Sequence, residues 1–333
     1  MKQMLVAIVA VATLWAGYWF WQSNAQEQAI ERWFDDRRHA GWAADYSDLS
    51  ISGFPNRIDT TLNDLLLGDP ATGVMWSAPF FQILRLSYNP GHVILILPNQ
   101  QTLATPRTEV QVRSSDLRSS LRLSDTANWS PERFVVAAED LDLQADSGWL
   151  FSAEKAQVSA ERKSPGEDSF RVTFQANGVS GFLPNWVDIR TSTGADPVLD
   201  LFRADLDITL DRPLNRLAIE KGRPQLSKLD LRLAEADWNG LRLAMAGSLE
   251  VNSAGTPSGR LTLKIRNWRE LLEQEAQAGR LSSAAFTQTE FALNLISQLS
   301  GNPETLDLPF DFKGGKVWLG PIVVGDTPVM RIP

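Results

Sequence analysis

The chain has 333 residues, of which 43% are hydrophobic and 22% are charged. This composition is typical of a folded protein, and the length suffices for one large or two ordinary domains. The net charge of -8 argues against a nucleic-acid partner, because such a surface needs clustered lysine and arginine. The absence of cysteine excludes disulfides and thiolate chemistry.

A run without charged residues extends from Met4 to Trp21. As a helix it would be about 27 Å long, close to the hydrocarbon core of a bilayer at about 30 Å. Aromatic residues, whose rings favour the headgroup layer, gather at its C-terminal end: Trp15, Tyr18, Trp19, Phe20 and Trp21. The run therefore predicts a single-pass transmembrane anchor at residues 1–25.

A cleaved secretory signal is the alternative, because Ser23-Asn24-Ala25 resembles a small-residue cleavage site. The run is longer than the apolar part of a signal peptide, about 7–15 residues, and it ends in bulky rings, so an anchor is favoured. Positive charges at Lys2 on one side and at Arg32, Arg37 and Arg38 on the other do not settle the orientation. Both interpretations export the rest of the chain, and we expect an inner-membrane protein with its bulk in the periplasm.

Apolar residues continue at helical spacing beyond the anchor, at Ala29, Ile30, Trp33 and Phe34. Gly41 then supplies a helix stop. We predict an amphipathic helix over residues 26–41 that continues from the anchor and lays one face on the first strands or on the membrane surface.

Residues 42–215 alternate between apolar and polar side chains, which predicts a first β-rich part. Its first strands are expected at Ser47–Gly53, Arg57–Leu67, Val74–Ser77 and Gln82–Tyr88. A turn or bulge is expected at Gly53-Phe54-Pro55, a strand end at Ala78-Pro79 and a turn at Asn89-Pro90-Gly91. In the fourth of these strands Leu84 and Leu86 alternate with Arg85 and Ser87. The leucines and the polar residues are therefore expected on opposite faces.

Val93–Leu97 is continuously apolar, which is typical of a strand buried on both faces or facing a hydrophobic interior. Further strands are predicted at Glu109–Arg113, Phe134–Leu143, Trp149–Ala160, Phe170–Ala176 and Val198–Leu210. Their spacing indicates an extended antiparallel meander.

Residues 216–333 form a second β-rich part with two helices. Its strands share one apolar face, at Leu229–Leu233, Leu241–Val251 and Leu261–Ile265, and Asn239-Gly240 is a strong hairpin signal. One helix is expected after Asn267, with Glu270 completing a capping box and Gly279 closing it, and a second over Ser283–Leu299, before Gly301 and Pro303. The last strands turn at Gly314-Gly315.

These elements predict a mainly β (α+β) protein. A transmembrane helix is followed by an extended, twisted antiparallel sheet with a few helices.

Four short segments, in this order, resemble an uncharacterised alphaproteobacterial envelope family, domain of unknown function 2125: Gly53-Phe54-Pro55, Met75–Pro79, Tyr88–His92 and Gly315–Pro321. The resemblance covers nearly the whole chain after the anchor. More loosely, Trp238-Asn239-Gly240 and Gly247–Val251 are similar to segments of AsmA-like envelope proteins, which are membrane-anchored, β-rich and linked to lipid transport or outer-membrane homeostasis. The resemblance implies no catalytic residues.

Two pairs of carboxylates alternate on predicted strands, Asp140 with Asp142 and Asp205 with Asp207. Alternation puts each pair on one face, where calcium binding or acid–base work competes with an ordinary solvated surface. The solvated surface is the favoured interpretation.

Other motifs carry little chemistry. His39 and His92 are expected to be surface or turn residues. Gly178-Val179-Ser180-Gly181 lacks the spacing of a nucleophile elbow, Gly314-Gly315-Lys316 lacks the flanking residues of a phosphate loop, and Asn128-Trp129-Ser130 is a chance glycosylation triplet. We predict no catalytic, cofactor-binding or metal-binding residue.

The apolar strand faces leave two alternatives open. The strands at Val93–Leu97, Leu229–Leu233 and Leu261–Ile265 close over a dry core, or a strongly curved sheet leaves an open apolar channel that suits an acyl chain. We expect a non-enzymatic envelope protein that binds or shuttles a lipid or other amphiphile. The alternative is a structural protein whose exposed strand edges pair with an envelope protein partner.

Overall fold

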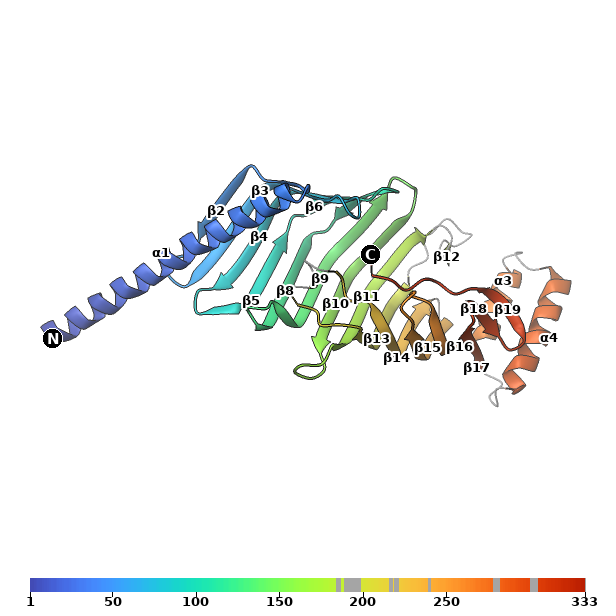
Figure 1. Cartoon of the computed structure of the whole chain (residues 1–333). Helices are drawn as coiled ribbons and strands as arrows, with labels where there is room; N and C mark the ends of the chain where they lie inside the picture. Colours follow the sequence, from blue (N-terminus) through green and yellow to red (C-terminus); the bar gives the residue numbers. More distant parts are fainter. Residues whose placement is uncertain are drawn as a thin grey trace. The chain divides into compact units, whose positions relative to one another are not determined.

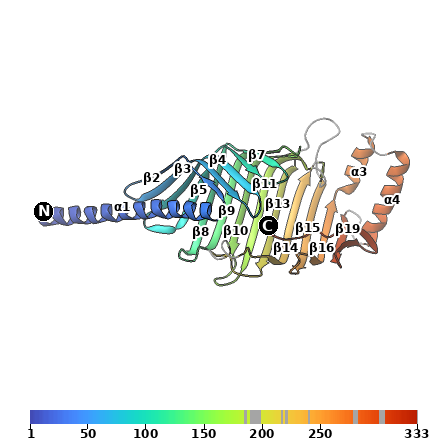
Figure 2. The same ribbon diagram turned by 45° about the horizontal axis from the view of Figure 1, so that its top comes forward.

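The computed structural model describes residues 1–183, 187–188, 199–215, 218, 222–238, 241–277, 282–299 and 305–332. They form mostly antiparallel strands with a few helices, which confirms the predicted fold class (Figures 1 and 2). The chain makes two compact units: unit 1 is Met1–Ser152 with Phe182–Asp188, and unit 2 is Ala153–Gly181 with Ile189–Pro333. The division predicted between residues 215 and 216 stays a prediction.

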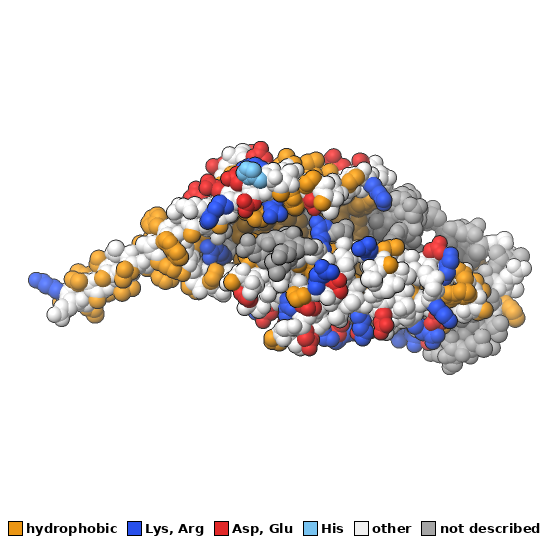
Figure 3. Space-filling model, in the orientation of Figure 1, with side chains coloured by type: hydrophobic (Ala, Val, Ile, Leu, Met, Phe, Trp, Pro, Cys, Tyr) orange, Lys and Arg blue, Asp and Glu red, His pale blue; other side chains and the backbone are white. Residues whose placement is uncertain are grey.

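Unit 1 begins with helix α1, Lys2–His39, which runs without interruption through the predicted anchor and the predicted amphipathic helix. Among the described helices, α1 is the one long and apolar enough to cross a membrane. Hydrophobic side chains surround its N-terminal end, where every residue from Met1 to Leu14 is exposed (Figure 3). Gly41 follows the helix with φ +85°, in agreement with the predicted stop.

The strands of unit 1 are joined by short connections in an antiparallel sheet. They are β1 Ala43–Asp45, β2 Asp48–Ser52, β3 Arg57–Asp69, β4 Val74–Leu86, β5 Asn89–Leu97, β6 Gln100–Ala104, β7 Glu109–Arg113, β8 Asp116–Asp125 and β9 Ser130–Ala145. β3 pairs with β1, β2 and β4, while β5 pairs with β4 and β8, and β9 pairs with β7 and β8.

The predicted break at Ala78-Pro79 is wrong, because β4 runs through it as one strand. Pro79 lies opposite Asp64, where the β3–β4 ladder is interrupted and Asp64 adopts φ +50°. On its other side β4 pairs with β6 at residues 75–77 and with β5 at residues 82–86. The backbone nitrogen of residue 79 therefore lies outside both pairings. The missing N–H of proline therefore breaks no hydrogen bond.

The turn predicted at Asn89-Pro90-Gly91 lies two residues earlier. Leu86 pairs with Asn89, so Ser87 and Tyr88 form the turn and Asn89 already belongs to β5.

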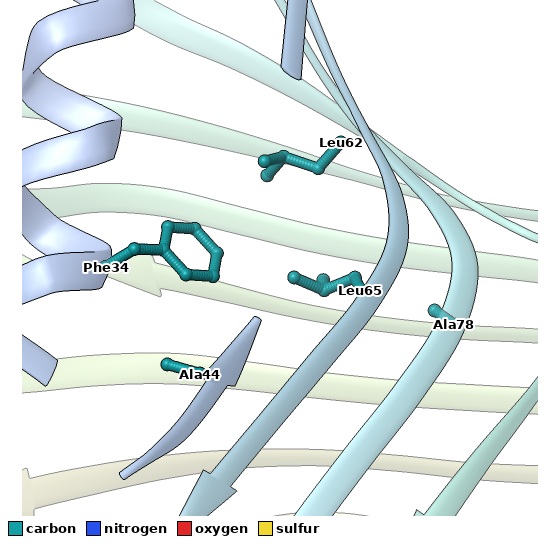
Figure 4. Packing of buried hydrophobic residues seen from close by; sticks show 5 residues of the cluster. All are labelled: Phe34, Ala44, Leu62, Leu65 and Ala78. Atoms are coloured by element: carbon teal, nitrogen blue, oxygen red, sulfur yellow. The ribbon is translucent and has the colours of Figure 1, made fainter. Parts of the chain in front are cut away.

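One face of α1 packs on this sheet around Phe34, which is 3% exposed and forms one core cluster with Ala44, Leu62, Leu65 and Ala78 (Figure 4). Burial of an aromatic side chain of this size contributes about 1.5–3 kcal/mol. The predicted docking of the amphipathic helix on the first strands is confirmed.

Most of unit 2 is formed by strands β10 Leu150–Arg162, β11 Ser169–Leu183, β13 Leu199–Leu210, β14 Leu226–Trp238, β15 Leu241–Val251, β16 Pro257–Arg266, β17 Thr305–Lys313, β18 Lys316–Leu319 and β19 Ile322–Asp326. The short β12, Val187–Asp188, pairs with the end of β11. From β13 to β19 each strand pairs with the next along the chain.

Two helices, α3 Trp268–Gln277 and α4 Ser283–Leu299, are inserted between β16 and β17. Trp268 and Leu272 of α3 form a small core with Leu306, against which Ile265 and Phe286 pack. The bounds of α4 agree with the prediction. Asn239-Gly240, Gly279, Gly301 and Pro303 lie outside the described residues.

Candidate functional site

The cross-strand register sorts the side chains of unit 2 onto two faces, because paired residues of neighbouring strands point to the same side. One face carries mostly apolar side chains; the charged exception is Arg162 of β10, whose guanidinium lies 4.7 Å from the ring centroid of Phe170. This apolar face consists of Phe170, Val172, Phe174 and Ala176 on β11, Phe202, Ala204, Leu206 and Ile208 on β13, Leu229, Leu231, Ala234 and Ala236 on β14, Leu241, Leu243, Met245 and Leu249 on β15, Leu261, Leu263 and Ile265 on β16, and Leu306, Leu308 and Phe310 on β17.

The opposite face, called the polar face, carries ion pairs between neighbouring strands. They include Arg171–Asp205 at 2.6 Å, Arg203–Glu235 at 2.6 Å, Arg260–Asp311 at 2.6 Å and Lys264–Asp307 at 3.5 Å. Exposed pairs of this kind contribute about 0–1 kcal/mol each. The polar face is therefore the solvated side of the sheet.

The alternation predicted for Leu229, Leu231 and Leu233 fails at its last residue. A bulge in β14 shifts the register between Leu231 and Ala234, and Arg232 donates from Nη2 to Oδ2 of Asp207 at 2.7 Å on the polar face. Ala234 thereby takes the next position of the apolar face, where it pairs with Met245.

Much of the apolar face is only half-buried. The helices α3 and α4 pack at Ile265 and Leu306, whereas every member of the face on β13 and β14 retains partial exposure. A dry core of this width would show fully buried leucines at these central positions. The described residues thus leave an apolar surface that is accessible along the middle of unit 2.

Unit 1 repeats this feature beyond α1. Val93, Leu95 and Leu97 of β5 share the side of the sheet that α1 covers at β3, and all three are half-buried. Ile94 on the other side is 39% exposed, so burial of this strand on both faces is wrong.

Arg85 is a charge within the apolar, helix-facing side of unit 1, where it pairs with Ile58 and Val93. Its Nη2 donates to Oε1 of Gln26 on α1 at 3.2 Å, and burial lowers the pKa of the guanidinium. Arg85 lies on the face opposite Leu84 and Leu86, as expected, but this face is the apolar side that α1 covers. Nearby on α1, Oε1 of Gln22 is buried without a hydrogen-bond partner.

The carboxylates of the pair Asp205 and Asp207 bind cations of the same face. Arg171 donates two hydrogen bonds to Asp205, and this contact lowers the pKa of the Asp205 carboxyl. Burial opposes ionisation of Asp207, but Lys163 and Arg232, both at 2.7 Å from its Oδ2, hold the pKa of Asp207 below its usual value.

Asp140 has φ +48° and accepts a 2.7 Å hydrogen bond from Ser115, while Asp142 lies opposite Arg113 in the β7–β9 register. Neither carboxylate pair belongs to a cluster that could hold a metal ion. The described residues contain no such group of three or more His, Cys, Asp or Glu.

The remaining motifs lie on surface elements. His39 ends α1 within 2.8 Å of the carbonyl oxygen of Asp35, and His92 on β5 is 2.9 Å from Oγ of Ser120. Gly178–Gly181 lies within β11, Gly314-Gly315 form the β17–β18 turn, and Asn128-Trp129 form the β8–β9 turn.

No curated protein and no solved structure matches the chain. From residue 19 to residue 328 the chain matches one family, described as uncharacterized protein conserved in bacteria, domain of unknown function 2125 (DUF2125). The protein therefore belongs to the DUF2125 family.

Proposed function

We propose that this protein is an inner-membrane-anchored, periplasmic protein that binds the acyl chains of a lipid or other amphiphile on its apolar face, without catalysing a reaction. The observation that carries the proposal is the half-buried apolar face of unit 2, backed by a face of ion pairs. A hydrocarbon chain makes no hydrogen bonds, so it suits a wall of leucine, valine and phenylalanine that offers none. The looser similarity to AsmA-like envelope proteins points the same way.

Retention of the N-terminal helix is supported by its contacts with the sheet. Trp15 donates from Nε1 to the carbonyl oxygen of Pro55 at 2.9 Å, and Trp19 does so to that of Arg57 at 2.6 Å. Cleavage after Ala25 would remove both contacts and would cut inside the continuous helix α1. An anchor therefore fits the fold better than a signal peptide does.

Arg85 favours an amphiphile with an anionic head. Its guanidinium lies beside Val93 on the apolar side of unit 1, and its described partner is the neutral Gln26. A charge buried without a carboxylate is costly, and an anionic headgroup would relieve that cost. Such a ligand would place its chain on Val93 and Leu95.

The experiment uses the full chain, extracted from bacterial membranes in a mild non-ionic detergent and examined by native mass spectrometry with lipid extraction. Near-stoichiometric phospholipid or fatty acid on the wild type is the expected result. Met245→Asp places a carboxylate on the apolar face and should remove most of the bound lipid. Ala246→Asp places the same group one residue along on the polar face and should leave the lipid in place.

A wild type that is compact and free of lipid contradicts the proposal, as does equal lipid on the two aspartate variants. A fall in bound lipid with both variants and a shared loss of thermal stability would indicate a folding defect. Met245→Ala shortens the side chain without adding charge. Less bound lipid on this variant at unchanged thermal stability would indicate loss of the binding surface and not a folding defect.

A second candidate function, pairing with an envelope protein, is favoured by one observation. In β19 the side chains of Ile322, Val323 and Val324 are 63%, 45% and 50% exposed, and the strand pairs with β18 along one edge. An exposed apolar edge strand is a template for β-augmentation. A photo-crosslinker placed at residue 323 in living cells should give one discrete protein adduct if this edge is occupied, and none if it is free.

A further inference from the structure

Three turns of unit 1 carry exposed aromatic side chains at their tips. Phe54 in the β2–β3 turn, Tyr88 in the β4–β5 turn and Trp129 in the β8–β9 turn are 55%, 63% and 53% exposed. Single exposed rings are common on folded domains, but rings that gather at one place on the surface indicate an interaction site.

The three turns lie at the same edge of the sheet, meaning here the edge formed by strand ends and turns and not an outer strand. β3 leaves the β2–β3 turn and runs antiparallel to β4, which ends at the β4–β5 turn. β5 starts from that turn and pairs antiparallel with β8, which returns to end at the β8–β9 turn. The β6–β7 turn, with the exposed Arg107, lies at the opposite edge, because β6 pairs with the start of β4.

The aromatic part of α1 contacts the same edge. Besides the bonds from Trp15 and Trp19, the hydroxyl of Tyr18 donates to the carbonyl oxygen of Ser87 at 3.4 Å. The rings of Phe20 and Phe54 stack with centroids 6.0 Å apart. The β2–β3 and β4–β5 tips are therefore fixed at the depth of residues 15–20 of the helix, and the β8–β9 tip lies at the same end of the sheet.

The length of the helix sets that depth. The part of α1 that is free of the sheet, residues 2–14, is about 20 Å long, which is about 10 Å less than the hydrocarbon core. A helix that crosses the bilayer must therefore take residues 15–21 into the boundary of the membrane, and the turns bound to these residues must go with them. Aromatic rings are the side chains that the headgroup layer accommodates best.

We propose that the edge of unit 1 formed by the Phe54, Tyr88 and Trp129 turns inserts into the headgroup layer of the bilayer that α1 crosses. This inference rests on the membrane anchoring proposed above. Docking by this edge brings Arg85, two residues before the β4–β5 tip at Ser87-Tyr88, to the level of the lipid headgroups. The helix-facing apolar side of unit 1 then begins at the membrane surface.

The natural chain contains no cysteine, so single cysteines can be labelled without background. Spin labels are placed on the full chain at Tyr88→Cys, at Trp129→Cys, at Arg107→Cys on the opposite edge and at Val9→Cys in the helix. The proteins are reconstituted in vesicles of phosphatidylethanolamine and phosphatidylglycerol. Collisions of each label with oxygen, which dissolves in lipid, are compared with collisions with a water-soluble nickel chelate.

The labels at residues 88 and 129 should collide with the nickel chelate several-fold less than the label at residue 107, at a depth near the headgroups. The label at residue 9 should report hydrocarbon. If either tip label is as accessible to nickel as residue 107 while residue 9 lies in hydrocarbon, the docking edge is wrong and the anchor stands. If residue 9 is also accessible to nickel, the anchor itself is wrong and both proposals fall.

Discussion

The indole nitrogen of Trp19 donates a 2.6 Å hydrogen bond to the carbonyl oxygen of Arg57, which joins the apolar helix to the first residue of β3. Trp19 is 6% exposed, and its ring meets that of Phe54 edge to face with centroids 5.4 Å apart. The helix is thus bound to the domain at the level where the apolar run ends.

Trp19→Phe keeps an aromatic ring at this contact and removes the hydrogen bond. We expect a loss of about 1 kcal/mol in the free energy that holds the helix on the sheet. Amide hydrogen exchange over residues 53–57 should become about fivefold faster, since 1.4 kcal/mol corresponds to a factor of ten. Trp33→Phe, on an exposed part of the same helix, is the control and should leave this exchange unchanged.

Arg85→Met replaces the buried guanidinium with an apolar side chain of similar length. Because its described partner is the neutral Gln26, we expect the free energy of unfolding to rise by about 1 kcal/mol, seen as a higher Tm. The share of anionic lipid that co-purifies should fall at the same time. Arg122→Met, an exposed substitution on the other side of the sheet, should change neither quantity. A lower Tm together with unchanged lipid would refute the assigned role of Arg85.

Asp207→Asn should destabilise unit 2 at neutral pH, because Lys163 and Arg232 lose the charge that they share. With both cations partly exposed, we expect about 1–2 kcal/mol. The lowered pKa of Asp207 means that its contribution is present above the unfolded pKa of about 3.9 and is lost as pH falls through the folded value. Thermal unfolding from pH 7 to pH 3 should therefore show the difference from wild type constant above about pH 5 and shrinking below about pH 4. A difference that grows on acidification would contradict this assignment.

Gly247→Ala should be strongly destabilising. The residue has φ +144°, and a Cβ there would lie 2.2 Å from the carbonyl oxygen of Arg260 on the neighbouring strand. Separating β15 from β16 at this point should cost about 2–4 kcal/mol, measured by thermal or denaturant unfolding. Gly325→Ala, where a Cβ meets nothing within 4 Å, is the matched control. If the two variants have the same free energy of unfolding, the strands accommodate a Cβ at residue 247 without loss of stability, and this prediction is wrong.

Much of the fold was predictable because side-chain periodicity is local. The 3.6-residue period of α1 and α4 and the alternation in β7, β13 and β16 are visible in the sequence itself. β8 is not predicted by the sequence pattern, because its serines and arginines mask the half-buried Leu117 and Leu121. The sequence predicts the β4–β5 turn at Asn89-Pro90-Gly91, two residues after its position at Ser87-Tyr88, because asparagine, proline and glycine favour turns more strongly than serine and tyrosine do.

The candidate site was less accessible to prediction. Alternation identified apolar faces at Leu229–Leu233 and Leu261–Ile265, but the bulge at Arg232 depends on the partner Asp207 on another strand. Whether such a face is covered depends on which helices pack on it, and this is a tertiary property. The position of Arg85 toward α1 likewise follows from the helix docking, since Leu84 and Leu86 made the other face look like the inner one.

The most direct test of lipid binding by the apolar face is crosslinking in living cells from two adjacent residues. Leu243 lies on the apolar face and Ala244 on the polar face of β15, and both are half-buried. The photo-reactive amino acid p-benzoylphenylalanine is placed at one position or the other, the cells are irradiated, and the purified chain is examined for lipid adducts by mass spectrometry. We expect a phospholipid or fatty-acid adduct from residue 243 and none from residue 244. No adduct from residue 243, or equal adducts from both residues, would contradict it.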